Sequence, residues 1–193
     1  MAKRKYEFRP DKPHADLLSK LYLTQKQRMS LLKWLLYALV LLVLSILQDV
    51  ILSRVDIFGA TTDLVPCAIL LICVLQGTET GSVFGLVAAA MYQFSGTAPG
   101  YHVIVLLPAL GIFAAMLRQS YLRKGFSSDV LCAGVAMLLY ELILFVVCLI
   151  FSLTAAARMG TFLLTGVLSL LLIPILYPIA TAIDKVGGET WKE

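Results

Sequence analysis

The sequence predicts an all-α integral membrane protein with six hydrophobic segments, and two observations carry that prediction. Apolar residues make up 60% of the 193 residues, whereas soluble domains contain about 45–50%. Charge is concentrated at the ends, because the 150 residues from Trp34 to Ile183 hold only 11 of the 28 charged side chains. A soluble enzyme or nucleic-acid-binding domain needs a charged surface on all sides, so both classes are excluded. Disordered, collagen-like and disulfide-rich secreted chains are excluded by the same composition.

The chain begins with a basic tail over residues 1–30, which we expect to lie in the cytoplasm. Nine of the 16 Lys and Arg residues fall within residues 3–33, directly before the first apolar run. Basic residues beside a membrane span set its orientation and attract anionic membrane lipids. The cluster therefore indicates topology rather than nucleic-acid binding. We expect a transmembrane helical domain over residues 31–186 and a short cytoplasmic tail over residues 187–193.

Three of the expected segments lie in the first half of the chain, and two of them are short. The first runs from Leu31 to Leu52, long enough for a hydrocarbon core of about 30 Å. The second, Leu64–Leu75, and the third, Ser82–Phe94, would each be shorter than about 20 Å as helices. They either cross the membrane by extending through their polar flanks or form a re-entrant hairpin buried among the other helices.

The other three segments lie in the second half of the chain. The fourth runs from Val103 to Leu117, and the fifth, Val130–Leu153, is long. The sixth, Phe162–Ile183, contains Pro174 and Pro178. Because proline lacks a backbone N–H and clashes with the preceding turn, the second half of this segment is expected to kink.

Six segments place both termini on the same side, and the basic residues indicate that this side is the cytoplasm. With the N-terminus inside, the inner segments carry 14 Lys and Arg residues, and the outer loops carry only Arg54 and Arg158. Basic residues accumulate in cytoplasmic loops. A re-entrant hairpin over residues 64–94 would leave this parity unchanged. The sequence therefore predicts a multi-pass protein of the cell membrane with both termini in the cytoplasm.

Small residues form a regular row in the third segment and just before it. Gly77, Gly81 and Gly85 recur every four residues, and Ala89 continues the row. This spacing places them on one helix face, where a second backbone can approach closely. Two interpretations remain open: the row docks a partner helix, or it packs inside the chain's own bundle.

A few polar residues lie within or beside the apolar segments. Glu141 is in the middle of the fifth segment, where an ionised carboxylate facing lipid would cost about 2.5–3.5 kcal/mol or more. We expect it to face the interior, either in a structural hydrogen bond or in a ligand, proton-relay or partner contact. Gln48 and Asp49 lie near the outer end of the first span. Asp63 directly precedes the second segment, where it is placed to cap the helix.

No group of residues indicates catalysis, a cofactor or a metal site. Gly100 and His102 belong to an outer loop, and His102 has no ligand set around it. No serine–histidine–acid grouping, phosphate-binding glycine loop or pair of catalytic carboxylates is recognisable, so we expect no enzyme activity. The cysteines show no CxxC pair, which predicts buried thiols that behave as small apolar side chains. They are Cys67, Cys73, Cys132 and Cys148.

Several features of this layout resemble one family of bacterial membrane proteins. Gln48 lies near the end of the first span, and a short loop containing Gly59 leads into Asp63. The glycine row, a turn over residues 95–102 and two long terminal spans follow. Over residues 31–186 the chain is similar to the rod-shape-determining MreD family, small inner-membrane proteins with five or six spans.

The chain also departs from the family pattern at three positions. Thr62 stands where the family usually has proline before the Asp. Ala88 and Tyr92 stand where a glycine and an acidic residue are expected. The role of that family acid therefore does not transfer to this chain.

The resemblance implies a scaffold of the complex that builds lateral peptidoglycan and sets cell shape. Its implied partners are the single-span protein MreC and, through it, the MreB filament and peptidoglycan synthases. MreD proteins are similar in architecture to the S components of energy-coupling-factor vitamin transporters, which are the alternative. S components dock through a small-xxx-small pattern in their first helix, but residues 31–52 contain only Ala38 and Ser45 as small residues. The two short segments would leave an outer-facing depression, for a partner in an MreD protein or a ligand in an S component.

Overall fold

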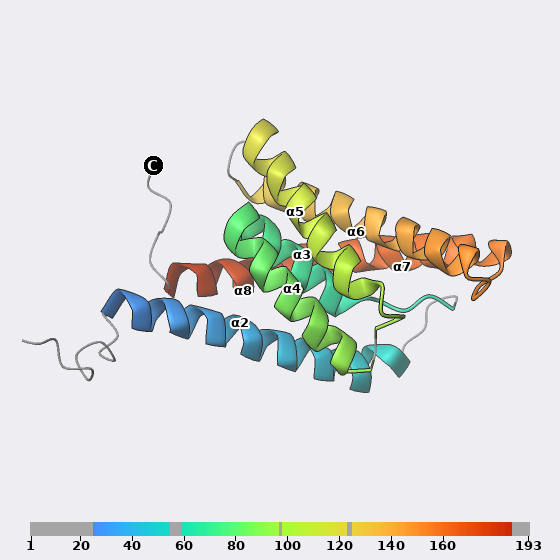
Figure 1. Cartoon of the computed structure of the whole chain (residues 1–193), viewed down its shortest axis with the longest axis horizontal. Coiled ribbons are helices and arrows are strands. Elements are labelled where there is room, and N and C mark those ends of the chain that lie inside the picture. Colours follow the sequence, from blue (N-terminus) through green and yellow to red (C-terminus); the bar gives the residue numbers. More distant parts are fainter. Residues whose placement is uncertain (1–24, 55–58, 97, 123–124, 187–193) are drawn as a thin grey trace, which may run out of the picture.

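The described part of the chain is all-helical and contains no β-strand, as the composition predicts (Figure 1). The residues that the computed structural model describes are 25–54, 59–96, 98–122 and 125–186. The tails expected over residues 1–30 and 187–193 fall outside these ranges, apart from residues 25–30. Those residues belong to the first helix, which begins six residues before the expected span.

The helices follow the expected segments in order, with boundaries that extend beyond several of the apolar runs. They are α2 (Gln25–Val50), α3 (Leu64–Gln76), α4 (Thr78–Phe94), α5 (Val103–Tyr121), α6 (Phe126–Ile150), α7 (Met159–Leu170) and α8 (Ile173–Val186), with short 3-10 turns η1 (Leu52–Arg54) and η2 (Ala156–Arg158). The additional turns of α5 and α6 contain Arg118 and Asp129, which form an ion pair. Helices α5 and α6 thus extend beyond their apolar runs, because the charged residues in the additional turns pair with each other.

Three helices, α2, α5 and α6, are long and apolar enough to cross a membrane. The α7 and α8 segments make a fourth candidate span, which is broken and bent by 46°. The break lies between Leu170 and Ile173, one residue before Pro174, in agreement with the kink expected in the sixth segment, because proline cannot donate the hydrogen bond that would continue the helix. The described residues therefore provide three or four candidate spans together with the short helices α3 and α4, and six crossings remain a prediction.

The short helix α3 forms the centre of the bundle (Figure 1). Of its 13 residues, 12 are buried, and it packs against α2, α4, α5, α6 and α8. A helix that is apolar on every side is stable only when neighbours cover every side. Gly77, with φ +85°, ends α3 and begins α4, which packs back along α3 as a hairpin. This positive φ explains why glycine occupies the junction.

The long helix α2 packs on the bundle along one narrow stripe. Buried positions recur every three or four residues at Lys33, Tyr37, Leu41, Leu44 and Gln48. Large apolar side chains between them are exposed, and α2 is the least buried of the three long helices. Most of its surface is therefore available to lipid or to another helix.

Two ion pairs close the end of the bundle where α2 starts and α8 ends. Lys33 Nζ lies 2.5 Å from Asp184 Oδ1, and Gln76 Nε2 donates a hydrogen bond to the same oxygen at 3.0 Å. Arg118 Nε lies 2.5 Å from Asp129 Oδ1. These contacts join α2 to α8 and α5 to α6. Helix α3 is bonded to the first pair through Gln76, and to the second through the Val74 carbonyl, which accepts a hydrogen bond from Arg118 Nη1.

Candidate functional site

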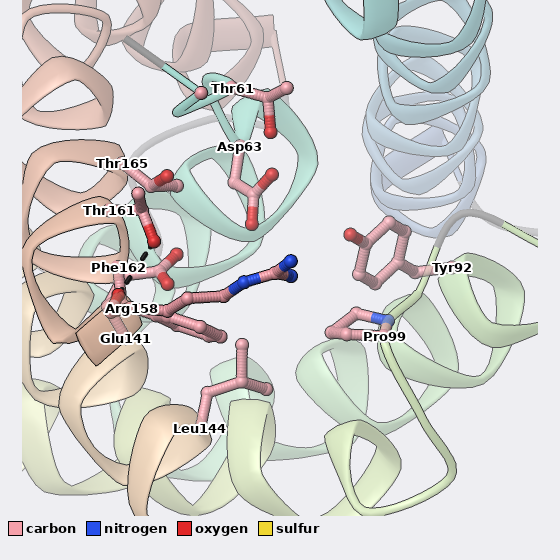
Figure 2. Close-up of a pocket in the computed structure, with 11 residues that line it drawn as sticks. Thr61, Asp63, Tyr92, Pro99, Glu141, Leu144, Arg158, Thr161, Phe162 and Thr165 are labelled. Atoms are coloured by element: carbon pink, nitrogen blue, oxygen red, sulfur yellow. Dashed lines mark hydrogen bonds between the residues drawn. The ribbon is translucent and has the colours of Figure 1, made fainter. Parts of the chain in front are cut away.

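A polar cavity of about 310 Å³ lies at the opposite end of the bundle, where α2 ends and α3 and α7 begin. Figure 1 shows this end of the bundle, and Figure 2 shows the residues that line the cavity. The residues that line it come from the loop before α3, from α4, α6 and α7, and from the loops between them. Its main polar lining consists of Thr61, Asp63, Tyr92, Glu141, Arg158 and Thr161. Residues far apart in the sequence thus meet in one cavity.

The carboxyl groups of Asp63 and Glu141 both line this cavity and interact with each other. Glu141 is only 1% exposed, so the prediction that it faces the interior is confirmed. Two neighbouring carboxyl groups repel each other when both are ionised, and ionisation costs most at the deeper, more buried position. We therefore expect Glu141 to hold a proton and Asp63 to carry the negative charge. The sequence analysis recognised no carboxylate pair, because these residues belong to different segments.

The start of α3, beside the cavity, is capped by side chains of other helices. Asp63 occupies the N-cap position, but its side chain makes no capping hydrogen bond, so its expected role as a cap is wrong. Gln48 Oε1 accepts a hydrogen bond from the Val65 N–H at 2.9 Å. Ser169 Oγ accepts one from the Asp63 N–H, also at 2.9 Å. The Asp63 carboxyl group consequently lines the cavity and does not bond to its own helix.

Tyr92 forms the wall of the cavity on the α4 side. Gln48 Nε2 donates to the Tyr92 hydroxyl oxygen at 3.5 Å, and the tyrosine is 2% exposed. A phenol thus lines the cavity at the position where the family resemblance leads us to expect a carboxylate. Asp49, also singled out from the sequence, is half-buried at the end of α2 and does not line the cavity.

Arg158 and two threonines line the cavity and were not identified from the sequence as site residues. The Arg158 side chain extends from η2 into the cavity, with its guanidinium group between Asp63 and Tyr92 in Figure 2. It forms no ion pair within 4.0 Å with the acidic residues of the described chain. Thr161 donates to the Arg158 carbonyl at 2.6 Å, and Thr165 lies one turn further along α7. The i, i+4 spacing of Thr161 and Thr165 in an otherwise apolar segment is the sequence feature that could have predicted this polar face.

The row of small residues lies inside the bundle, so the prediction that it docks a partner helix is wrong. A Cβ atom on Gly81 would lie 2.6 Å from the Cys73 carbonyl oxygen, and one on Gly85 would lie 2.8 Å from Cys73 Sγ. Both glycines and Ala89 are buried. Gly77 forms the α3–α4 junction instead of continuing the face. The row therefore allows α4 to pack closely on α3, as the second interpretation holds.

Gly100, His102 and the four cysteines lie outside the cavity. His102 occupies the N-cap position of α5 without a capping hydrogen bond, and its ring packs over Gly100. All four cysteines are buried and form no disulfide. Within the described ranges, no cluster of three or more His, Cys, Asp or Glu residues is placed to hold a metal ion.

The cavity presents side chains that complement charges of both signs. The carboxyl pair accepts hydrogen bonds from a cationic group, and the Arg158 guanidinium donates to an anionic group. Comparison of the chain with protein-family models, curated proteins and solved structures finds no match.

Proposed function

We propose that this chain is a non-enzymatic membrane scaffold of the MreD type, which serves the complex that builds lateral peptidoglycan in a bacterial cell. It would lie in the inner membrane with both termini in the cytoplasm. The family resemblance over residues 31–186 and the basic residues at one end of the spans support this proposal. The partner expected from the resemblance is a single-span protein like MreC, which would connect the scaffold to the MreB filament and the synthases.

The observation that carries the proposal is an open apolar groove between α2 and α4. The groove has a volume of about 520 Å³. Its apolar lining includes Trp34, Ala38, Val83, Phe84, Val87 and Ala88. The alanines on the two helices permit close approach of a third helix, which is how helices associate in membranes without a hydrophobic driving force. The loosely packed α2 and this groove therefore favour docking of a partner helix.

Substitution of a groove residue tests the docking directly. Val87, 55% exposed on α4, lines the groove, whereas Val105, 71% exposed on α5, does not. We expect Val87→Trp to reduce co-purification with the MreC-like partner by about tenfold or more, because the bulky ring fills the space for the partner. Val105→Trp serves as the control and should retain the partner. Equal retention by both variants would show that lipid, not a partner helix, covers the groove.

The polar cavity favours a second candidate function, that of an S component in a vitamin transporter. An S component would use a depression at the outer end of the bundle to hold its substrate. Depletion of the protein in its source bacterium separates the two functions. Rounded cells would support the scaffold, whereas vitamin auxotrophy with normal cell shape would support transport.

A further inference from the structure

The cavity beside α3 is lined by two carboxyl groups and a guanidinium group that form no ion pair with each other. The carboxyl groups of Asp63 and Glu141 both line the cavity, and the buried Glu141 Oε1 makes no hydrogen bond in the described chain. Arg158 is exposed at the cavity and lies more than 4.0 Å from either carboxyl group. The volume of about 310 Å³ is at the lower end of the range for small-molecule sites, which is about 300–1,000 Å³.

We propose that this cavity binds a small zwitterion whose protonated amine contacts Asp63 and whose anionic group contacts Arg158. A ligand that carried only a positive charge would be repelled by Arg158, and one that carried only a negative charge would be repelled by the carboxyl pair. A zwitterion satisfies both sides at once. This inference goes beyond the proposed scaffold role and does not require a partner helix in the α2–α4 groove.

The residues of the cavity have distinct roles in this proposal. Half-buried Asp63 contacts the amine, and the more deeply buried Glu141, which lines the same cavity, is a positioning residue for the Asp63 carboxylate. Arg158 donates to the anionic group, since guanidinium matches the geometry of carboxylate and phosphate oxygens. Thr165 offers a hydroxyl group on the same wall as Arg158. Divalent cations are a poor fit, because only two carboxyl groups of the described residues line the cavity and Arg158 opposes them.

Two sources supply this ligand chemistry. Phosphoethanolamine, the headgroup of a common phospholipid, carries an ammonium and a phosphate group, and a free amino acid carries an ammonium and a carboxylate group. The cavity is reachable from either source because it lies at the ends of the helices and Arg158 extends to the surface.

Binding of soluble probes to the full-length chain in detergent tests the proposal. The zwitterions O-phosphoethanolamine and glycine are compared with ethanolamine and methyl phosphate, which each carry one of the two charges. We expect at least one zwitterion to bind about tenfold or more tightly than both single-charge probes, because hydrogen bonds to two charged groups are then made. The proposal is overturned if neither zwitterion binds, or if a single-charge probe binds as tightly.

Matched variants locate the binding. Asp63→Asn and Arg158→Gln should each weaken zwitterion binding about tenfold or more. Asp49→Asn and Arg54→Gln change the same residue types at the same end of the bundle but outside the cavity, and they should bind normally. Equal weakening by the cavity variants and their controls would contradict the assignment. If a cavity variant does not fold, the probe series on the unmodified chain decides.

Lipid nanodiscs distinguish the two sources. Competition of phosphatidylethanolamine, but not phosphatidylglycerol, with the soluble probe identifies a lipid headgroup as the ligand. Probe binding that is equal in both lipids identifies a dissolved molecule. Because these measurements use the chain without its partner, their failure would leave the co-purification test of the scaffold role unaffected.

Discussion

At the scale of single residues, the buried position of Glu141 determines which protonation state its carboxyl group favours. It lies in α6, nine residues before the helix ends at Ile150, and is almost completely buried. Burial leaves Glu141 little contact with water that could solvate a charge, so its carboxyl group is more stable with its proton, as a hydrogen-bond donor. The Asp63 carboxyl group lines the same cavity. The pair therefore connects the start of α3 to the middle of α6 and makes both residues dependent on each other.

Substitution of Glu141 separates hydrogen bonding from ionisation. Glu141→Gln keeps the size and a hydrogen-bond donor, so we expect its thermal unfolding in detergent to match the unmodified chain. Glu141→Leu removes the donor and leaves Asp63 without its partner, which should destabilise the fold by about 1–3 kcal/mol. If Gln destabilised the protein as much as Leu, the proton of the carboxyl group itself would be required.

The residue scale also shows what the sequence could and could not predict about the site. The interior position of Glu141 follows from its depth in an apolar segment, so it was predictable. Its partner was not, because Asp63 lies 78 residues earlier and only the fold brings the two together. Arg158 was counted as an outer-loop charge, and nothing in the local sequence indicates that its side chain points inward.

At the scale of helices, both α4 and α5 pack closely against Cys73 of α3. Cβ atoms added to Gly85 of α4 and Gly111 of α5 would lie 2.8 and 2.9 Å from Cys73 Sγ. A Cβ atom on Gly81 would instead meet the Cys73 carbonyl oxygen at 2.6 Å. The contacts of Gly85 and Gly111 involve the Cys73 sulfur atom, which a substitution of Cys73 can remove. The contact of Gly81 involves the Cys73 backbone, which such a substitution leaves in place.

This difference predicts the outcome of a double-mutant cycle. Gly85→Ala and Gly81→Ala should each destabilise the bundle by about 1–3 kcal/mol through overpacking. Cys73→Ala should recover much of the loss in Gly85→Ala, because it removes the sulfur atom, and little of the loss in Gly81→Ala. Gly160→Ala in α7 meets nothing within 4 Å and is the control. Equal recovery of both variants, measured by thermal unfolding, would contradict this packing.

Helix faces were more predictable than helix neighbours. The spacing of Gly81, Gly85 and Ala89 correctly indicates one close-packing face, but a spacing carries no information about which helix covers that face. The bend between α7 and α8 was predictable because proline acts locally. The start of α2 at Gln25 was not, since the polar residues before Leu31 show no apolar run.

At the scale of the whole molecule, the two ends of the bundle differ in chemistry and its sides are apolar. Ion pairs close the end that holds the start of α2 and the end of α8, whereas the polar cavity occupies the other end. Large apolar side chains such as Leu35, Val105 and Leu142 are exposed along the sides. An exposed apolar surface of this extent is suited to lipid, and its polar ends are suited to the two membrane interfaces.

Orientation in the membrane can be tested with a single helix. Tyr101, just before α5, and Tyr121, at its end, are 83% and 82% exposed, and the native cysteines are buried. We expect Tyr101→Cys to react with a membrane-impermeant maleimide in intact cells. Tyr121→Cys should react only after permeabilisation, because the basic residues around this end favour the cytoplasmic side. Labelling of both in intact cells would show that α5 does not cross. The reverse pattern would invert the orientation and place the polar cavity in the cytoplasm, out of reach of an extracellular ligand.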